Sequence, residues 1–72
     1  MSRRWYEIPN GMALDYPTGM PCARVFGPGS KAEVWWAVWA PLGAHLDGQA
    51  MRRGSIADGV LAAEERLRED GR

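Results

Sequence analysis

The residues best suited to chemistry in this chain are one histidine, one cysteine and a nearby carboxylate. His45 and Asp47 stand two positions apart beside a turn signal, and Cys22 follows a proline where a strand is expected to begin. An imidazole beside a carboxylate can act as a general base with its orienting partner, and a thiolate can act as a nucleophile. One hypothesis is therefore an enzyme built on Cys22 and His45.

The spacing of these residues is nonetheless more typical of a surface loop and a structural cysteine than of a catalytic set. A nucleophile needs an oriented base within hydrogen-bond reach, and no pair of acidic residues is evidently placed for acid–base work. A zinc site needs about four ligands, of which Cys22 and His45 supply only two. We expect a non-enzymatic protein with no catalytic residue, no metal and no cofactor.

The size and charge of the chain narrow its class. Its 72 residues predict one domain, and 46% hydrophobic residues predict that the domain folds. Nine basic and nine acidic residues cancel, so the chain lacks the positive field that attracts nucleic acids. A single cysteine forms no internal disulfide, and the N-terminal arginines precede no apolar segment. We expect a cytoplasmic protein, in the host cytoplasm if a phage encodes it, with no membrane association.

Turn residues divide residues 5–40 into short strands. Asn10-Gly11 is a strong hairpin signal, because both residues tolerate positive φ. Pro28-Gly29 fits the central positions of a type II turn and predicts a second hairpin that ends in a tryptophan-rich strand. Beyond another turn signal at Asp47-Gly48, residues 49–52 fit a short edge strand whose arginines blunt the edge.

An amphipathic helix is predicted over residues 56–70, with Ser55 and Asp58 placed to cap its start. One helical face collects apolar residues: Ile56, Val60, Ala63 and Leu67, widened by Ala57 and Leu61. Gly59 costs the helix about 1 kcal/mol relative to alanine unless an aromatic ring, such as a tryptophan of the sheet, packs against it. The expected fold class is α+β, a small antiparallel sheet of three to five strands followed by one C-terminal helix packed on one face.

The stretch EVWWAVWA at residues 33–40 offers no polar face to water. Alternation along a strand sorts its residues into two faces: Val34, Trp36, Val38 and Ala40 on one, and Glu33, Trp35, Ala37 and Trp39 on the other. A single helix covers one face of a small sheet, and the valine face suits it. Trp35 and Trp39 are then left as an exposed patch of the kind that marks an interface.

The first hairpin offers an alternative cover for this patch. Trp5, Tyr6 and Tyr16, folded over Trp35 and Trp39, would turn both tryptophans into core residues. A second copy of the chain would also bury them in a homodimer. The sequence leaves both alternatives open.

Two resemblances imply the same kind of act. Residues 36–67 resemble the C-terminal part of a HicB-type antitoxin core, through the run WAVWAPLG, the Asp47-Gly48 pair and the alanine-rich helix from Ser55. The chain departs from that family by extra residues before Ser55 and carries no counterpart of its DNA-binding tail. In layout, a short neutral chain with a small sheet and one helix is similar to phage and mobile-element inhibitors, including anti-CRISPR proteins. Both resemblances imply that the protein occludes a functional surface on a larger protein.

The sequence therefore favours a small non-enzymatic inhibitor of phage or mobile-element origin that binds and neutralises a larger protein. Trp35 and Trp39 are the expected contact residues, and Arg52 and Arg53 are their expected polar rim. An antitoxin-like module that neutralises a toxin is one alternative.

A single-stranded nucleic-acid-binding module is another alternative. Bases would stack on Trp35 and Trp39, and Arg24 and Lys31 would contact phosphates. The neutral net charge makes this alternative less favoured than a protein partner.

Overall fold

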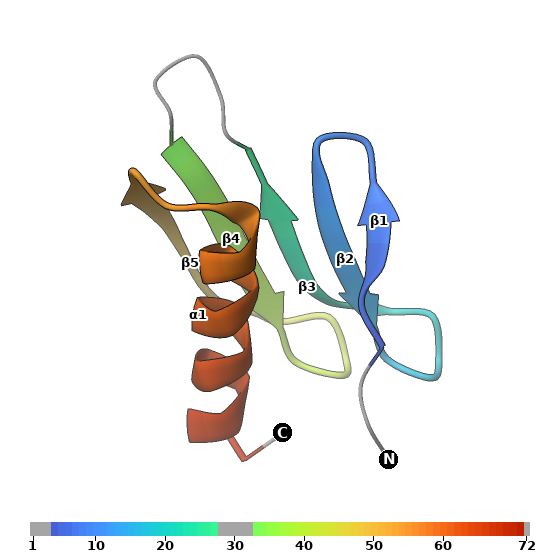
Figure 1. Cartoon of the computed structure of the whole chain (residues 1–72). Helices are drawn as coiled ribbons and strands as arrows, with labels where there is room; N and C mark the ends of the chain where they lie inside the picture. The colour runs from blue at the N-terminus through green and yellow to red at the C-terminus, as the bar shows by residue number, and fades with distance from the viewer. Residues whose placement is uncertain (1–3, 28–32, 72) are drawn as a thin grey trace.

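Five strands form one antiparallel sheet, and a single helix lies across one of its faces (Figure 1). The computed structural model describes residues 4–27 and 33–71. The elements are β1 (Tyr6–Ile8), β2 (Gly11–Asp15), β3 (Pro21–Phe26), β4 (Glu33–Trp39), β5 (His45–Arg52) and α1 (Ile56–Glu69). Each strand pairs with the next along the chain, in the order β1-β2-β3-β4-β5. The predicted fold class is confirmed.

Tight connections set this simple strand order. The predicted hairpin of β1 and β2 is present, but its two connecting residues are Pro9 and Asn10, of which Asn10 takes a φ of 60°. Gly11 already belongs to β2 and does not take a positive φ. Gly27 follows β3 with a φ of 128°, and an added Cβ would lie 2.5 Å from the Glu33 carbonyl oxygen. β3 and β4 form the predicted second hairpin, whose Pro28-Gly29 turn lies outside the described residues.

β5 is longer than the predicted edge strand of residues 49–52, because it begins at His45. The turn after β4 closes early, where the Ala40 N–H donates to the Ala44 carbonyl oxygen at 2.8 Å. Asp47-Gly48, predicted as a turn, therefore lies inside β5 and pairs with β4. The sheet therefore has a long strand, β5, at one of its edges.

The core lies between α1 and the face of the sheet that α1 covers. Its buried residues are Leu14, Cys22, Ala23, Val25, Val34, Trp36, Val38, Ala63 and Leu67. The three buried residues of β4 alternate along that strand as the sequence predicts. The helix contributes a narrower stripe than predicted, because Leu61 is 65% exposed and Ala57 is also exposed. Ala62 packs against the core in their place.

A capping box starts α1. The Asp58 N–H donates to the Ser55 hydroxyl at 3.1 Å, and the Ser55 N–H donates to the Asp58 carboxylate at 2.9 Å. These bonds satisfy two N–H groups that helix geometry leaves without partners, although aspartate replaces the usual glutamate or glutamine. The backbone N–H and then the hydroxyl of Ser55 hold the pKa of Asp58 below its usual value.

Gly59 marks the closest approach of α1 to the sheet. An added Cβ would lie 2.6 Å from Val25 Cγ1 and 3.0 Å from Val34 Cγ1. Two valines of neighbouring strands therefore pack against this glycine, and the prediction of a tryptophan ring there is wrong. The missing side chain lets the helix backbone rest directly on β3 and β4.

We predict that Gly59→Ala destabilises the fold, although alanine improves helix propensity by about 1 kcal/mol. The new methyl group would collide with two buried valines, and overpacking of this kind costs about 1–3 kcal/mol. We expect the free energy of unfolding, measured by urea denaturation, to fall by roughly 1 kcal/mol. Combining Gly59→Ala with Val25→Ala should make room for the methyl group and give a smaller loss than the two single variants added together. A Gly59→Ala variant as stable as the wild type would contradict the close approach.

Candidate functional site

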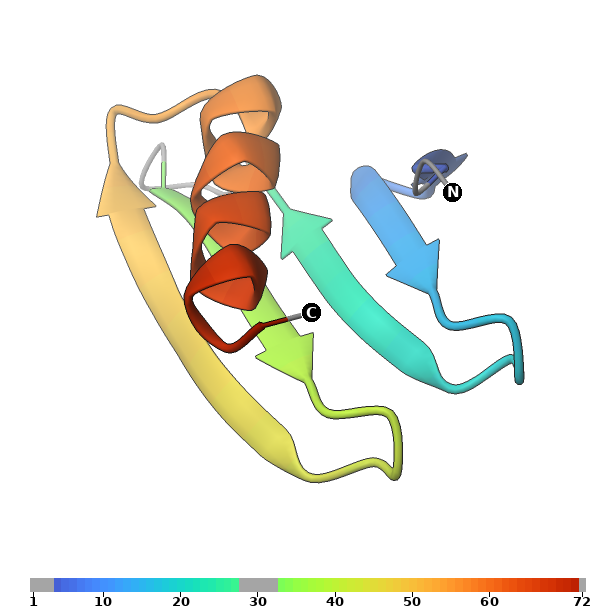
Figure 2. The ribbon, with the colours of Figure 1, turned by 90° about the horizontal axis from the view of Figure 1, so that it is seen from below.

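The face of the sheet opposite α1, called the open face below, carries an apolar row across all five strands. The strand register aligns Ile8, Gly11, Phe26, Trp35 and Ala50 from β1 to β5. A second row, one step along the strands, contains Tyr6, Ala13, Arg24, Ala37 and Gly48. α1 lies on the other side of the sheet (Figure 2). The described part of the chain therefore leaves the open face without a helical cover.

Trp35 and Phe26 are the two largest exposed side chains of the apolar row. Trp35 is 55% exposed and Phe26 is 44% exposed, and they face each other across the β3–β4 pair. Residues opposite each other in a sheet have Cβ atoms about 5 Å apart, so the two side chains leave the open face from adjacent positions. The exposed position of Trp35 agrees with the alternation in the sequence. Phe26 escaped the sequence analysis, although counting alternate positions on from Arg24 would have placed it on this face.

The first hairpin extends the sheet and does not fold over the tryptophans. β1 forms the edge of the sheet beside β2, and Trp5 and Tyr16 pack against the buried core. The Tyr16 hydroxyl donates to the Trp39 carbonyl oxygen at 2.7 Å and ties the hairpin to the end of β4. The alternative in which this hairpin covers Trp35 is therefore wrong.

Trp39 is half-buried and less accessible than Trp35. Its ring meets the His45 ring edge to face, with 5.7 Å between centroids. The β4–β5 register shifts between Val38 and Trp39, so Trp39 lies at an irregular end of the sheet. Trp35 and Trp39 share the open face, but the register sets Trp35 opposite Phe26, whereas the ring of Trp39 contacts His45.

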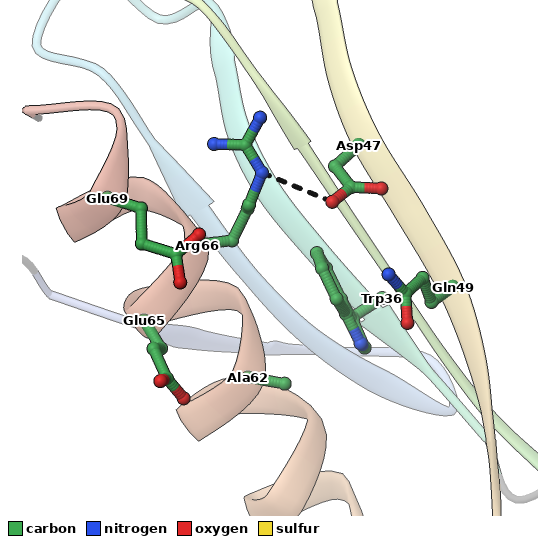
Figure 3. Close-up of a pocket in the computed structure, with 7 residues that line it drawn as sticks. All are labelled: Trp36, Asp47, Gln49, Ala62, Glu65, Arg66 and Glu69. Carbon is green, nitrogen blue, oxygen red and sulfur yellow. Dashed lines mark hydrogen bonds and ion pairs between the residues drawn. The ribbon is translucent and has the colours of Figure 1, made fainter.

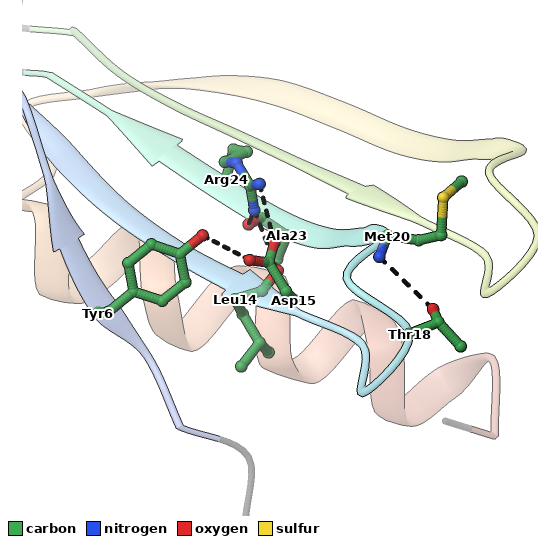
Figure 4. A network of polar contacts seen from close by, with 7 residues as sticks. All are labelled: Tyr6, Leu14, Asp15, Thr18, Met20, Ala23 and Arg24. Carbon is green, nitrogen blue, oxygen red and sulfur yellow. Dashed lines mark hydrogen bonds and ion pairs between the residues drawn. The ribbon is translucent and has the colours of Figure 1, made fainter.

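A tyrosine, an aspartate and an arginine connect three strands beside the apolar row (Figure 4). The Tyr6 hydroxyl donates to Asp15 at 2.5 Å, and Arg24 forms an ion pair with the same carboxylate at 2.8 Å. The hydrogen bond from Tyr6, helped by Arg24 and opposed by desolvation, holds the pKa of Asp15 below its usual value. The same bond raises the pKa of Tyr6. Arg24 also donates to the Leu14 carbonyl oxygen at 3.1 Å. The Arg24 side chain is therefore held in place by Asp15 and by the backbone of β2.

Arg52 and Arg53 are exposed at the far end of β5. Arg52 lies opposite Glu33 across the β4–β5 pair, two positions along β5 from Ala50 in the apolar row. Arg53 follows the strand with a φ of 58° and leads toward the helix. Arg52 therefore borders the row at its β5 end, beside Ala50.

The side chains of Cys22, His45 and Asp47 engage different neighbours. Cys22 is 1% exposed within the core, and His45 faces Trp39. Asp47 accepts a hydrogen bond from Arg66 of α1 at 3.1 Å. Across residues 4–27 and 33–71, no group of three or more histidine, cysteine, aspartate and glutamate residues could hold a metal ion.

A groove lies on the covered side of the sheet, between α1 and β5 (Figure 3). It has a volume of about 320 Å³ and is lined by Trp36, Asp47, Gln49, Ala62, Glu65, Arg66 and Glu69. Arg66 crosses it to pair with Asp47 at 3.1 Å. Within the described residues, Glu65 and Glu69 make no ion pair, so the groove keeps an excess of negative charge.

Comparisons of the chain with protein-family models, curated proteins and solved structures find no match. No helix in the described part of the chain is long and apolar enough to cross a membrane.

The Tyr6–Asp15 hydrogen bond predicts how acid weakens the fold. Because the folded pKa of Asp15 lies below its usual 3.8, its carboxylate stabilises the fold above that value. The stabilisation is lost as the pH falls through the folded pKa. Tyr6→Phe removes the largest cause of the shift, so the Asp15 pKa should rise toward its usual value in an NMR titration of the side-chain carboxyl carbon.

Tyr16→Phe is the matched control for this titration. It removes a phenolic hydroxyl that binds the Trp39 carbonyl oxygen and not Asp15. The Asp15 pKa should stay at its wild-type value in Tyr16→Phe. An unchanged Asp15 pKa in Tyr6→Phe would show that Arg24 sets the shift alone.

Proposed function

We propose that this chain is a small non-enzymatic protein that binds a larger protein through its open face and thereby neutralises it. The observation that carries the proposal is the exposed Trp35–Phe26 pair, which lies in the middle of an apolar row five strands wide. Apolar patches of this kind on a folded domain typically mark interaction sites.

The energetics of the pair favour binding. A large aromatic side chain buries about 150–250 Å² when it is covered, and Trp35 still exposes more than half of its surface. Tryptophan is enriched among the few residues that supply most of the binding energy at protein interfaces. The residue opposite Trp35 on β5 is Ala50, whose small side chain covers little of the Trp35 ring.

The charges of the open face favour a protein over a nucleic acid. Arg24 is neutralised by Asp15 at 2.8 Å, and Arg52 lies opposite Glu33. A surface that binds a phosphate backbone needs cations in excess of carboxylates. The described residues of the open face carry no such excess, and Lys31 lies outside the described residues.

An inhibitor of this kind acts by covering the surface that the partner needs for its own activity, so the chain needs no catalytic residue. The anti-CRISPR-like interpretation places that surface on a host defence protein, with the chain encoded by a phage or mobile element. The antitoxin-like alternative places it on a toxin. Both interpretations use Trp35 as the central contact, with Trp39 and the arginines Arg52 and Arg53 at its margins.

Stacking of single-stranded bases on Trp35 and Phe26 is the rival function, because aromatic side chains on a sheet also accept nucleobases. Phosphate contacts make such binding fall steeply with salt. Binding to the open face that persists at high salt in nuclease-treated material supports a protein partner.

We predict that Trp35→Ala abolishes capture of the partner by the tagged full chain from a nuclease-treated lysate of its source or host. Truncating a central hot-spot residue costs about 2 kcal/mol or more, which is roughly 30-fold in affinity. Leu61→Ala is the matched control, since Leu61 is 65% exposed but lies on α1, away from the open face. The wild type and Leu61→Ala should retain the same stoichiometric protein.

Two outcomes would overturn the proposed function. Equal capture by the wild type and a folded Trp35→Ala variant would show that the open face is not the binding site. Capture of nothing except further copies of the chain, lost in Trp35→Ala, would assign the open face to a homodimer.

A further inference from the structure

The two edges of the sheet are unequal. β1 has 3 residues and is followed by a proline, whereas β5 has 8 residues. Residues 48–51, the centre of β5, contain no charged residue and no proline. Natural sheets protect their edges with short strands, charges and prolines, because an unprotected edge can pair with another chain. The middle of β5 lacks these protections.

The backbone of β5 has hydrogen-bonding groups directed away from β4. The Gly48 N–H donates to the carboxylate of its own neighbour, Asp47, at 2.8 Å. Outward-pointing groups recur at every second residue of an antiparallel edge strand, so those of Ala50 lie on the same edge. Because the Gly48 N–H is already bonded to Asp47, the outward groups of Ala50 are the ones that an additional strand can pair with directly.

Small residues terminate both rows of the open face at this edge. Ala50 ends the apolar row and Gly48 ends the second row. An added strand would lie about 10 Å from β4, two strand spacings away. A large apolar side chain on it could therefore pass over Ala50 and contact the exposed ring of Trp35.

On the side of β5 that α1 covers, the surface beside the edge is negatively charged and not apolar. Gln49 points to this side and lines the groove together with Glu65 and Glu69, which keep their charge uncompensated. Lysine and arginine side chains on an added strand are long enough to reach over Gln49 toward these carboxylates. The groove therefore complements basic residues at the alternate positions.

We infer that the partner contributes an extended segment that pairs with β5 as a sixth strand, with large apolar side chains on the open face and basic side chains toward the groove. This inference rests on the proposed function and names the form in which the partner binds. Successive side chains of a strand point to opposite faces of the sheet. The open face therefore selects apolar residues at every second position of the segment, and the groove selects basic residues at the positions between them.

A second copy of the chain fits this edge poorly. Two β5 strands paired about a two-fold axis keep their faces aligned, so an axis at Gln49 would set Gly48 of one copy opposite Ala50 of the other. The Trp35 rings would stay uncovered, and two negatively charged grooves would adjoin the same seam. A segment with large apolar and basic side chains would instead cover the Trp35 ring and balance the negative charge of the groove.

Selection of binders from a random linear peptide library on the immobilised full chain tests the inference. We expect enriched peptides to alternate large apolar and basic residues, and to perturb the Gly48 and Ala50 amide signals in NMR spectra. Enrichment of peptides without two-residue alternation, or of no peptide, would overturn it.

Two changes to the chain make the selection specific. Ala50→Pro removes an outward N–H without removing a bond to β4, and should weaken the selected peptides roughly tenfold or more, whereas Ala50→Ser keeps the N–H and should bind normally. Glu65→Lys combined with Glu69→Lys should shift the selection from basic to acidic residues. An unchanged selection in this charge-reversed variant, which leaves the strand intact, would overturn the assignment of the basic side chains.

The outcomes separate this inference from the proposed function. A partner protein that is lost by Trp35→Ala but retained by a folded Ala50→Pro variant would leave the open face as the binding site and remove the sixth strand. A partner retained by both variants would remove the proposed function as well.

Discussion

The contact of α1 with β3 and β4 at Gly59 is the constraint on which the rest of the structure depends. Val25 and Val34 occupy the space that a side chain would need, so the helix can lie flat on the middle of the sheet. A helix is about 10 Å wide with its side chains, and five strands at about 4.8 Å spacing are wider. One helix therefore covers the centre of one face. The open face and the groove beside β5 are what this single contact leaves uncovered.

The distribution of charge follows from the same arrangement. The chain is neutral as a whole, but its surfaces are not equivalent. On the open face, the ion pair of Arg24 with Asp15 balances charge beside the apolar row. In the groove, Arg66 is committed to Asp47 while Glu65 and Glu69 keep their charge. One side of β5 therefore offers apolar contacts and the other offers negative charge, although net charge predicts neither.

The sequence predicts those features that depend on neighbours along the chain. Alternation in β4, the Asn10-Gly11 hairpin and the Ser55 cap are local patterns, and the structure contains each of them. Features that depend on pairing between strands are harder to foresee. Phe26 becomes important only because the register sets it opposite Trp35. Asp47-Gly48 has the composition of a turn, but the preceding turn at Ala40 closes first and draws the pair into β5. The helix stripe is narrower than periodicity indicates because the sheet meets it at Gly59.

The isolated chain has two separate unfavourable features: apolar side chains exposed to water on the open face, and a long edge strand, β5, without a neighbouring strand. Covering Trp35 and Phe26 removes apolar surface from water but leaves the outer edge of β5 without a neighbouring strand. Pairing β5 with an arbitrary strand fills that edge but leaves the rings exposed. Because Ala50 lies between the edge and Trp35 in one row, one extended segment can meet both requirements when its side chains are large on the open side. The small residues at Gly48 and Ala50 are therefore as important to recognition as the tryptophan, since bulkier side chains there would separate the edge from the ring.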